Sequence, residues 1–288
     1  MPASVGAAEP PRGLRLTSTP DLGRLLATGG VSQVEGAGGG GLTPWATIAG
    51  YGSENSYGAN VHATVLKTQD YLLETYGVAV GVADRVEVSL ASQVIKGKGA
   101  ALDNVRIRQD IVGIKLRVSG NLVYDQDTPM PQIAIGAMYK KNQGISGLPG
   151  VTSVTQLGAA RDNGIDYYVS ATKLVLDRSL LLNATLRLTK ANQMGLLGFG
   201  GDLDDRYKPM LETSIAYLLN RNVVIGAEYR MKPSNLSIDN EKDYYDAFVA
   251  WFPNKNFSVT AAYVSLGDIT VLNTTRQRGW YLSMQGGF

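Results

Sequence analysis

Several residue types and patterns are missing from this chain of 288 residues. It contains no cysteine, which excludes disulfide bonds and thiolate metal sites and suits an oxidising compartment, where a stray thiol is a liability. No run of about 18 apolar residues occurs, so a transmembrane helix is excluded. The net charge of +2 is too small to indicate nucleic-acid binding. The opening MPASVGAAEPPRG has no apolar core of a signal peptide, so for an exported chain we expect a removed signal or a reassigned start.

What the chain does contain is a period-two alternation of apolar and polar residues. The alternation recurs in segments of about ten residues that end at turn residues, as in the strands of membrane barrels. In the segment 223–231, Val223 and Ile225 share one face, while Glu228 and Arg230 share the other. No long segment has the 3.6-residue period of a helix. We therefore expect an all-β fold.

The lengths of the connections separate a membrane barrel from a soluble β-sandwich, because the strands of both alternate. Short connections at 83–85, 176–179 and 220–222 alternate with long ones near 191–207 and 233–242. Outer-membrane barrels have short periplasmic turns and longer outside loops, whereas a sandwich needs no such rhythm. Counting back from the last residue, with a first strand near 27–35, gives about fourteen strands, or about twelve if the weak first pair fails.

The final residues, WYLSMQGGF, alternate in the same way and end on Phe288. This ending resembles the closing strand of Gram-negative outer-membrane β-barrels, in which the terminal aromatic residue is read by the barrel-assembly machinery. The resemblance implies that Phe288 is an assembly signal. The stretch from about residue 24 to the end also resembles an uncharacterised proteobacterial barrel family of unknown function. The phrases that carry this resemblance are LLATGGVSQVEGAGGGGLTPWATIAGYG, YGVAVGVADRVEVSLA and YDQDTPMPQIAIGAMYKKN. It implies export and an outer-membrane location, and it supplies no catalytic or ligand residue.

Charged residues on the polar strand faces are the candidate functional residues. They could tune the selectivity of a polar channel, or they could form cross-strand ion pairs that fill and seal the lumen. If 220–222 is a turn, Glu212 lies opposite Arg230 and Ser214 lies opposite Glu228. The predicted pore-lining residues are Glu87, Lys115, Arg117, Arg187, Glu212, Glu228, Arg230 and the only histidine, His62.

Three motifs allow other chemistry. The glycine-rich run 36–41 lacks the Lys-Ser/Thr of a phosphate loop, so we expect a flexible strand connection. Asp202, Asp204 and Asp205 could bind Ca²⁺ but lack the EF-hand spacing, so solvated loop acids are expected. His62 has no Gly-x-Ser-x-Gly nucleophile and no cysteine or second histidine to share a zinc ion with. We expect no catalysis, no metal and no cofactor.

The sequence thus predicts an all-β protein with a single antiparallel up-and-down transmembrane β-barrel over 24–288, in a bacterial outer membrane. Residues 1–23 are expected to be a disordered tail, with a lumen plug as the alternative. The expected function is passive diffusion of small polar solutes or ions. The alternatives are a sealed scaffold that binds a protein partner and an outer-membrane lipid-modifying enzyme. Expected partners are membrane lipid, the barrel-assembly machinery, the solutes, and a protein partner or further copies of the chain.

Two further expectations follow from the outward face of the barrel. Leu186→Arg, pointing to lipid, should cost about 2–4 kcal/mol, and Thr185→Arg, pointing to the lumen, much less. Aromatic residues of the membrane interface are expected at Tyr51, Tyr57, Tyr139, Tyr229, Trp251, Tyr263 and Trp280.

Overall fold

The computed structural model describes residues 22–98, 102–239, 241–271 and 275–288. Most of the segment expected to be a tail or plug, residues 1–21, lies outside the described residues. Within the described ranges, no helix has the length and apolar character needed to span a membrane.

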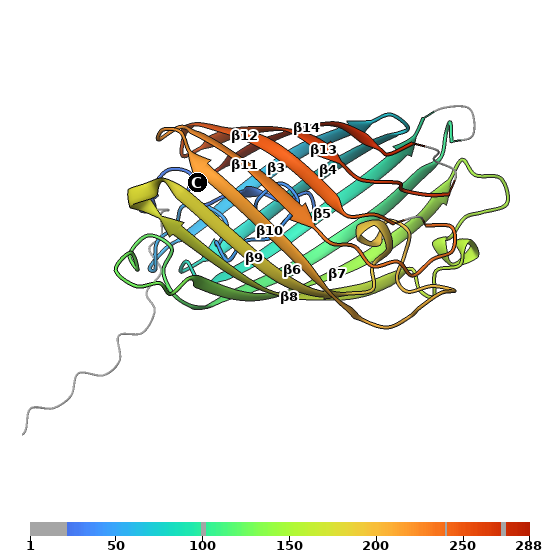
Figure 1. Cartoon of the computed structure of the whole chain (residues 1–288), viewed down its shortest axis with the longest axis horizontal. Helices are drawn as coiled ribbons and strands as arrows, with labels where there is room; N and C mark the ends of the chain where they lie inside the picture. Colours follow the sequence, from blue (N-terminus) through green and yellow to red (C-terminus); the bar gives the residue numbers. More distant parts are fainter. Residues whose placement is uncertain (1–21, 99–101, 240, 272–274) are drawn as a thin grey trace, which may run out of the picture.

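Twelve antiparallel strands form a closed barrel, in which each strand pairs with its neighbours in the chain and β14 pairs with β3 (Figure 1). The all-β barrel prediction is confirmed, with the lower of the two strand counts. The wall strands are β3 (Tyr57–Thr68), β4 (Tyr71–Val82), β5 (Val86–Gly97), β6 (Arg106–Ser119), β7 (Gln132–Ser146), β8 (Asn163–Val175), β9 (Leu180–Thr189), β10 (Lys208–Leu218), β11 (Val223–Arg230), β12 (Tyr244–Asn254), β13 (Phe257–Ser265) and β14 (Arg278–Gly287).

The period-two pattern of the sequence becomes the two faces of this wall. On β9, Leu186 is 51% exposed on the outside, whereas its neighbours Thr185 and Arg187 are buried inside. The register across β10 and β11 places Glu212 opposite Arg230 and Ser214 opposite Glu228, as the turn length predicts. Side chains therefore divide into an apolar outer face and an inner face that carries the buried charged groups together with apolar side chains such as Leu181 and Phe248.

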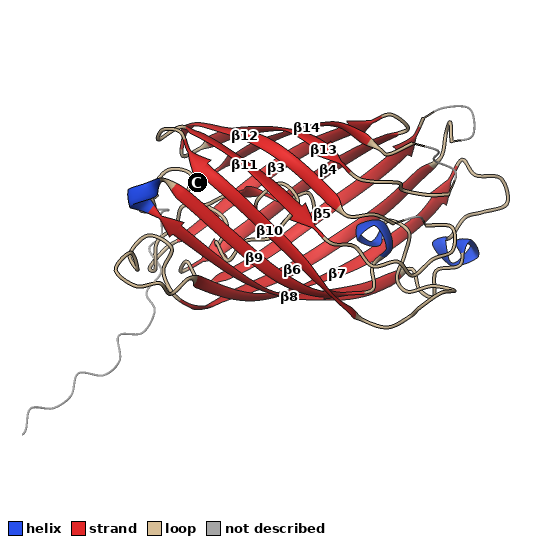
Figure 2. Ribbon diagram, viewed as in Figure 1, coloured by secondary structure: helices blue, strands red, loops and turns tan. Residues whose placement is uncertain are grey.

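The two ends of the barrel differ in the length of their connections (Figure 2). At the end that holds the C-terminal residue, Ala83 and Asp84 make a tight hairpin turn with φ values of 54° and 48°. Two successive positive φ values match the twist of the strands that the turn joins. The opposite end carries most of the long connections, including those with the 3₁₀ helices η1 (Val154–Leu157) and η3 (Asn192–Gly195), whereas the long connection 120–131 lies at the first end. The third, η2 (Leu176–Arg178), lies in a turn at the first end.

Residues 28–52, in the blue part of the chain, lie inside the barrel (Figure 1), so the fourteen-strand prediction is wrong. We call residues 24–52 the inner segment; its short hairpin pairs β1 (Val31–Ser32) with β2 (Gly38–Gly39). Residues 28–52 are buried without interruption. A wall strand would expose every second side chain to lipid, and continuous burial is what a segment enclosed on all sides shows. The weak alternation near 27–35 therefore does not mark a wall strand.

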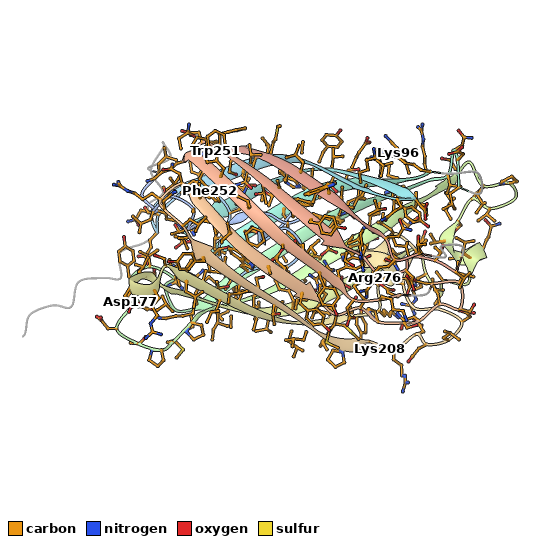
Figure 3. The ribbon with its side chains drawn as sticks, turned by 45° about the horizontal axis from the view of Figure 1, so that its top comes forward. Lys96, Asp177, Lys208, Trp251, Phe252 and Arg276 are labelled. Carbon is orange, nitrogen blue, oxygen red and sulfur yellow. The ribbon has the colours of Figure 1, made fainter. Side chains whose placement is uncertain are left out.

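Most of the predicted interfacial aromatic residues do lie on the outer face. Tyr139, Trp251, Tyr263 and Trp280 are exposed, and Tyr57 and Tyr229 are half-buried. In Figure 3, Trp251 lies towards the end of the barrel that holds Asp177, and Lys96 and Arg276 lie towards the other.

Tyr51 is the exception among the predicted interfacial aromatics. It belongs to the inner segment and is buried, with its hydroxyl accepting a hydrogen bond from the Ala27 N–H at 3.2 Å. Its assignment to the membrane interface is therefore wrong, for the same reason as the extra strand pair.

Candidate functional site

The inner face of the barrel and the inner segment together form the candidate functional site. Wall side chains from many strands contact the inner segment, and much of the contact is polar. The inner segment supplies backbone N–H and C=O groups that have no long strand to pair with, so wall side chains have to satisfy them.

Glu87 on β5 and Lys115 on β6 form the first set of contacts. They are paired at 3.0 Å, and both side chains are 1% exposed. Glu87 accepts hydrogen bonds from the N–H groups of Gly38 at 3.0 Å and Ala49 at 2.8 Å. The Lys115 ammonium donates to the carbonyls of Gly38 and Thr47, both at 2.7 Å. One wall ion pair thus holds both arms of the inner segment.

A cluster of six charged side chains, which we call the lumen ion cluster, forms the second set. One carboxylate comes from the inner segment and the others come from successive wall strands β7 to β11. Its members are Glu35, Lys140, Asp166, Arg187, Glu212 and Arg230. All are at most 3% exposed. Three positive and three negative groups make the cluster neutral, which burial requires because an unpaired buried charge is costly.

Glu35 is the connection between the inner segment and this cluster. Its carboxylate pairs with Lys140, with Arg230 at 2.7 Å and with Arg187 at 3.4 Å. Arg187 also pairs with Glu212 at 2.5 Å. Without the inner segment, the three positive groups of the wall would therefore face only the two carboxylates of Asp166 and Glu212.

Glu228 on β11 makes the third set of contacts, at the tip of the glycine-rich run. It accepts hydrogen bonds from the Leu42 N–H and the Thr43 hydroxyl, both at 2.6 Å, and from Ser214 at 2.8 Å. A Cβ atom on Gly40 would lie only 1.9 Å from the Glu228 carboxylate. The run 36–41 is therefore a closely packed contact with the wall, and its interpretation as a flexible strand connection is wrong.

A fourth set of ion pairs lies where the inner segment enters the barrel. Asp84, in the turn between β4 and β5, pairs with Arg24 at 3.2 Å and with Arg117 at 3.0 Å. Arg24 also donates to the carbonyls of Ile48 at 2.6 Å and Thr28 at 2.8 Å. The two arms of the inner segment are thereby joined to each other and to the short-turn end of the wall.

His62 stands apart from these contacts. Its ring is buried on β3 and points over Gly77, where a Cβ atom would come within 2.3 Å of the ring. Neither ring nitrogen has a hydrogen-bond partner among the described residues. A catalytic histidine needs a nucleophile on one side and an orienting group on the other, and this environment provides neither within the described residues.

All eight predicted pore-lining side chains point into the barrel and are buried. Most of these eight side chains contact the inner segment, or contact another side chain that touches it. The interior that they line is therefore filled by the inner segment. Sequence reasoning missed Glu35, Lys140 and Asp166. Lys140 and Asp166 are on the inward parity of β7 and β8, so extending the alternation along those strands would have found them. Nothing in the alternation marks Glu35, because it is not on a wall strand.

The aspartates of the 202–205 loop are engaged with the protein itself. Asp204 pairs with Arg206 at 3.0 Å and Asp205 with Lys190 at 2.6 Å, while Asp202 accepts a hydrogen bond from the Ser237 N–H. Among the residues that the structure describes, no group of three or more metal-binding side chains is gathered.

Comparisons with known proteins agree with a barrel. The model of a family described as "Protein of unknown function (DUF3034)" matches residues 28–285. No curated protein matches the sequence. Among solved structures, the NanC porin is similar with a TM-score of 0.52 and 9% identity, covering 79% of this chain and 98% of its own. The KdgM porin has a TM-score of 0.49 and 13% identity, covering 80% and 99%. Outer membrane phospholipase A from Escherichia coli has a TM-score of 0.43 and 8% identity, and the match covers 79% of this chain and 92% of that one. The likeness to the NanC porin is one of fold alone.

Proposed function

The chain belongs to the DUF3034 family of proteins of unknown function, and we propose that it is an outer-membrane channel for small polar solutes or ions. In this proposal the inner segment is a plug, and solutes pass when it leaves its place in the lumen. The same proposal includes a location in the outer membrane, recognition of Phe288 by the barrel-assembly machinery, and association with further copies of this chain. It involves no reaction chemistry.

One observation carries this proposal: many contacts between the wall and the inner segment are hydrogen bonds and ion pairs, beside an apolar cluster in which Val31 and Trp45 pack with wall residues such as Phe248. Glu87, Lys115 and Glu228 bind its backbone, and Arg187 and Arg230 bind Glu35. Water and solute ions can replace the polar partners once the segment moves, whereas the apolar contacts would be left exposed to water. A polar inner wall is also what a water-filled barrel needs.

A second candidate, a sealed structural barrel, is favoured by the filling of the lumen. Residues 28–52 are continuously buried, and the lumen ion cluster is neutral only with Glu35 in place. Such a barrel would serve as a scaffold for a protein partner and would pass no solute. The lipid-modifying alternative has no comparable support, because His62 has no catalytic partner among the described residues.

A disulfide that fastens the inner segment to the wall tests the channel proposal. The Thr43 and Ser214 hydroxyl oxygens are 2.6 Å apart, and the chain has no other cysteine, so T43C/S214C would form a single bridge between the inner segment and β10. We expect ohmic conductance steps in a planar bilayer for the parent protein. The oxidised variant should be silent, and reduction should restore its steps.

The matched control is T64C/S283C, whose hydroxyl oxygens are 2.8 Å apart on the paired wall strands β3 and β14. This bridge leaves the inner segment free, so oxidation should not change its conductance. A folded parent protein that never conducts would refute the channel and favour the sealed scaffold. Conductance that persists in the oxidised T43C/S214C variant would refute the plug.

A further inference from the structure

A second feature of the molecule is an apolar cavity among the long connections, at the end of the barrel opposite the C-terminal residue. Its volume is about 230 Å³. The lining comes from the ends of β4 to β7, from Leu102 and Val105 before β6, and from the connections that follow β7, β9, β11 and β13 at that end (Figure 2). Much of the cavity lining is aliphatic, including Ile95, Ile107, Ile145, Leu197, Ile238 and Ile269.

The chemistry of the lining does not suit a polar solute. Among the described residues that line the cavity, none is charged. The most polar lining group, the Gln193 amide, is already engaged: its nitrogen donates to Asp239 at 2.7 Å and to the Ile269 carbonyl at 3.2 Å, and its oxygen accepts from the Tyr244 hydroxyl. An apolar molecule loses no hydrogen bonds on entering such a space, whereas a polar one would.

The size of the cavity fits a small molecule. In another protein, an engineered apolar cavity of about 150 Å³ stays dry and binds benzene. The present cavity is larger than that, and its lining is of the same kind. An apolar void that stays empty forfeits contacts on every side, so an occupant of matching shape would stabilise the folded state.

The cavity can be reached from the aqueous side. Val271 at its edge is 59% exposed, and Leu148, Leu157 and Ile238 are only partly buried. These residues belong to the long connections beyond the wall strands, away from the outer face that would meet lipid. A connection that only needed to stay soluble would gain nothing from exposing aliphatic side chains there.

We propose that this cavity binds a small apolar molecule, either an aromatic or aliphatic hydrocarbon or the hydrocarbon end of a longer compound. The site is separate from the proposed route for polar solutes. η3 stands between them, and the Met194 carbonyl in η3 accepts hydrogen bonds from Lys140 at 3.1 Å and from Gln109 at 3.2 Å. Binding at this site and conduction through the lumen can therefore be tested independently.

The test uses the full chain in phosphatidylcholine nanodiscs with a small aromatic diazirine as photolabel, toluene as competitor and mass spectrometry to locate the label. We expect saturable labelling of the segments around Ile107 and Leu197 that toluene suppresses. Ile238→Trp, which fills the cavity from a loop, should reduce this labelling by about tenfold or more, equivalent to about 1.4 kcal/mol in binding.

Leu203→Trp is the matched control, because Leu203 is an exposed loop leucine outside the lining. It should leave labelling unchanged. If Ile238→Trp fails to give a folded barrel on a heat-modifiability gel, Leu157→Trp fills the same space from η1. Label that reaches only lipid-facing positions such as Leu186, rises without saturation and is equal in all variants would overturn the proposal.

Discussion

At the scale of single residues, the two faces of β9 make the simplest test of the barrel. Leu186→Arg places a charge on the exposed apolar face, and we expect it to lower the free energy of unfolding by about 2–4 kcal/mol. Leu186→Ala is the control and should cost far less, since lipid can fill the space. Urea unfolding in lipid vesicles measures both. Similar losses for the two variants would mean that Leu186 does not meet lipid.

Thr185 is not a suitable control for Leu186, because it would tolerate an arginine only if the lumen were open. It is fully buried, and its hydroxyl donates to the Pro44 carbonyl of the inner segment at 2.8 Å. An arginine there would collide with the inner segment. We therefore expect Thr185→Arg to cost more than the small amount expected for an open lumen, because the inner segment occupies the space in which water was assumed.

Glu35 is the residue on which the neutrality of the lumen ion cluster depends. Glu35→Gln leaves Lys140, Arg187 and Arg230 with one negative charge too few, and we expect a loss of about 3–5 kcal/mol of unfolding free energy. Glu74→Gln is the matched control. Glu74 pairs with Lys96 at 2.6 Å with both side chains partly exposed, so its loss should cost at most about 1 kcal/mol. Equal effects in vesicle unfolding would argue against a buried cluster.

At the scale of elements, the seating of the inner segment depends on glycine. Gly40→Ala should displace the segment from Glu228, because the added methyl group has no room. We expect faster hydrogen exchange across residues 31–49 with little change in the wall strands, measured by mass spectrometry. Gly286→Ala on β14 is the control, since its nearest neighbours would lie 3.9 Å away. Exchange in 31–49 that is unchanged by Gly40→Ala would contradict the packing described for this run.

Asp239, in the connection between β11 and β12, has a carboxyl group with an unusually high pKa. Burial, together with the neighbouring Glu241 carboxylate, raises the pKa of Asp239 to about 9 from its ordinary value of 3.8. The folded state therefore favours the neutral acid. Its contribution to stability is complete below pH 3.8 and is lost as the pH rises through about 9.

We expect this loss to loosen the connections around η3, because Asp239 accepts a hydrogen bond from Gln193. Hydrogen exchange of residues 190–199, corrected for intrinsic rates, should accelerate progressively between about pH 4 and pH 9 and level off above that. Asp239→Asn keeps an acceptor for Gln193 without the charge, so it should remove the acceleration. If the variant accelerates like the parent, another group is responsible.

At the scale of the whole molecule, the outer face decides where the protein can fold. Large apolar side chains are exposed on every wall strand except β11, among them Val61, Tyr76, Ile114, Ile215 and Trp280. We expect the chain to aggregate in buffer and to fold in detergent or lipid, giving strand-rich circular dichroism and a heat-modifiable gel band. A monodisperse monomer folded in buffer alone would contradict a membrane barrel.

The sequence predicts the wall of this molecule well and its interior poorly. Alternation and connection length identify the outward Leu186, the inward Arg187 and the facing pair Glu212 and Arg230, because each depends on neighbours within one hairpin. The inner segment depends on contacts such as Glu35 with Arg230, far away in the chain. A local pattern does not report such contacts, so its first residues resembled a weak strand.

The seam between β14 and β3 forms late in folding and limits how the inner segment can move. The Phe288 carbonyl accepts hydrogen bonds from the N–H groups of Ala59 on β3 and Tyr51 at the end of the inner segment. The seam between β14 and β3 thus joins opposite ends of the chain, and such distant pairings form slowly. Once they have formed, a ring of hydrogen-bonded strands surrounds the interior. From then on the inner segment can enter or leave the interior only through an end of the barrel, which is the path that the proposed plug would take.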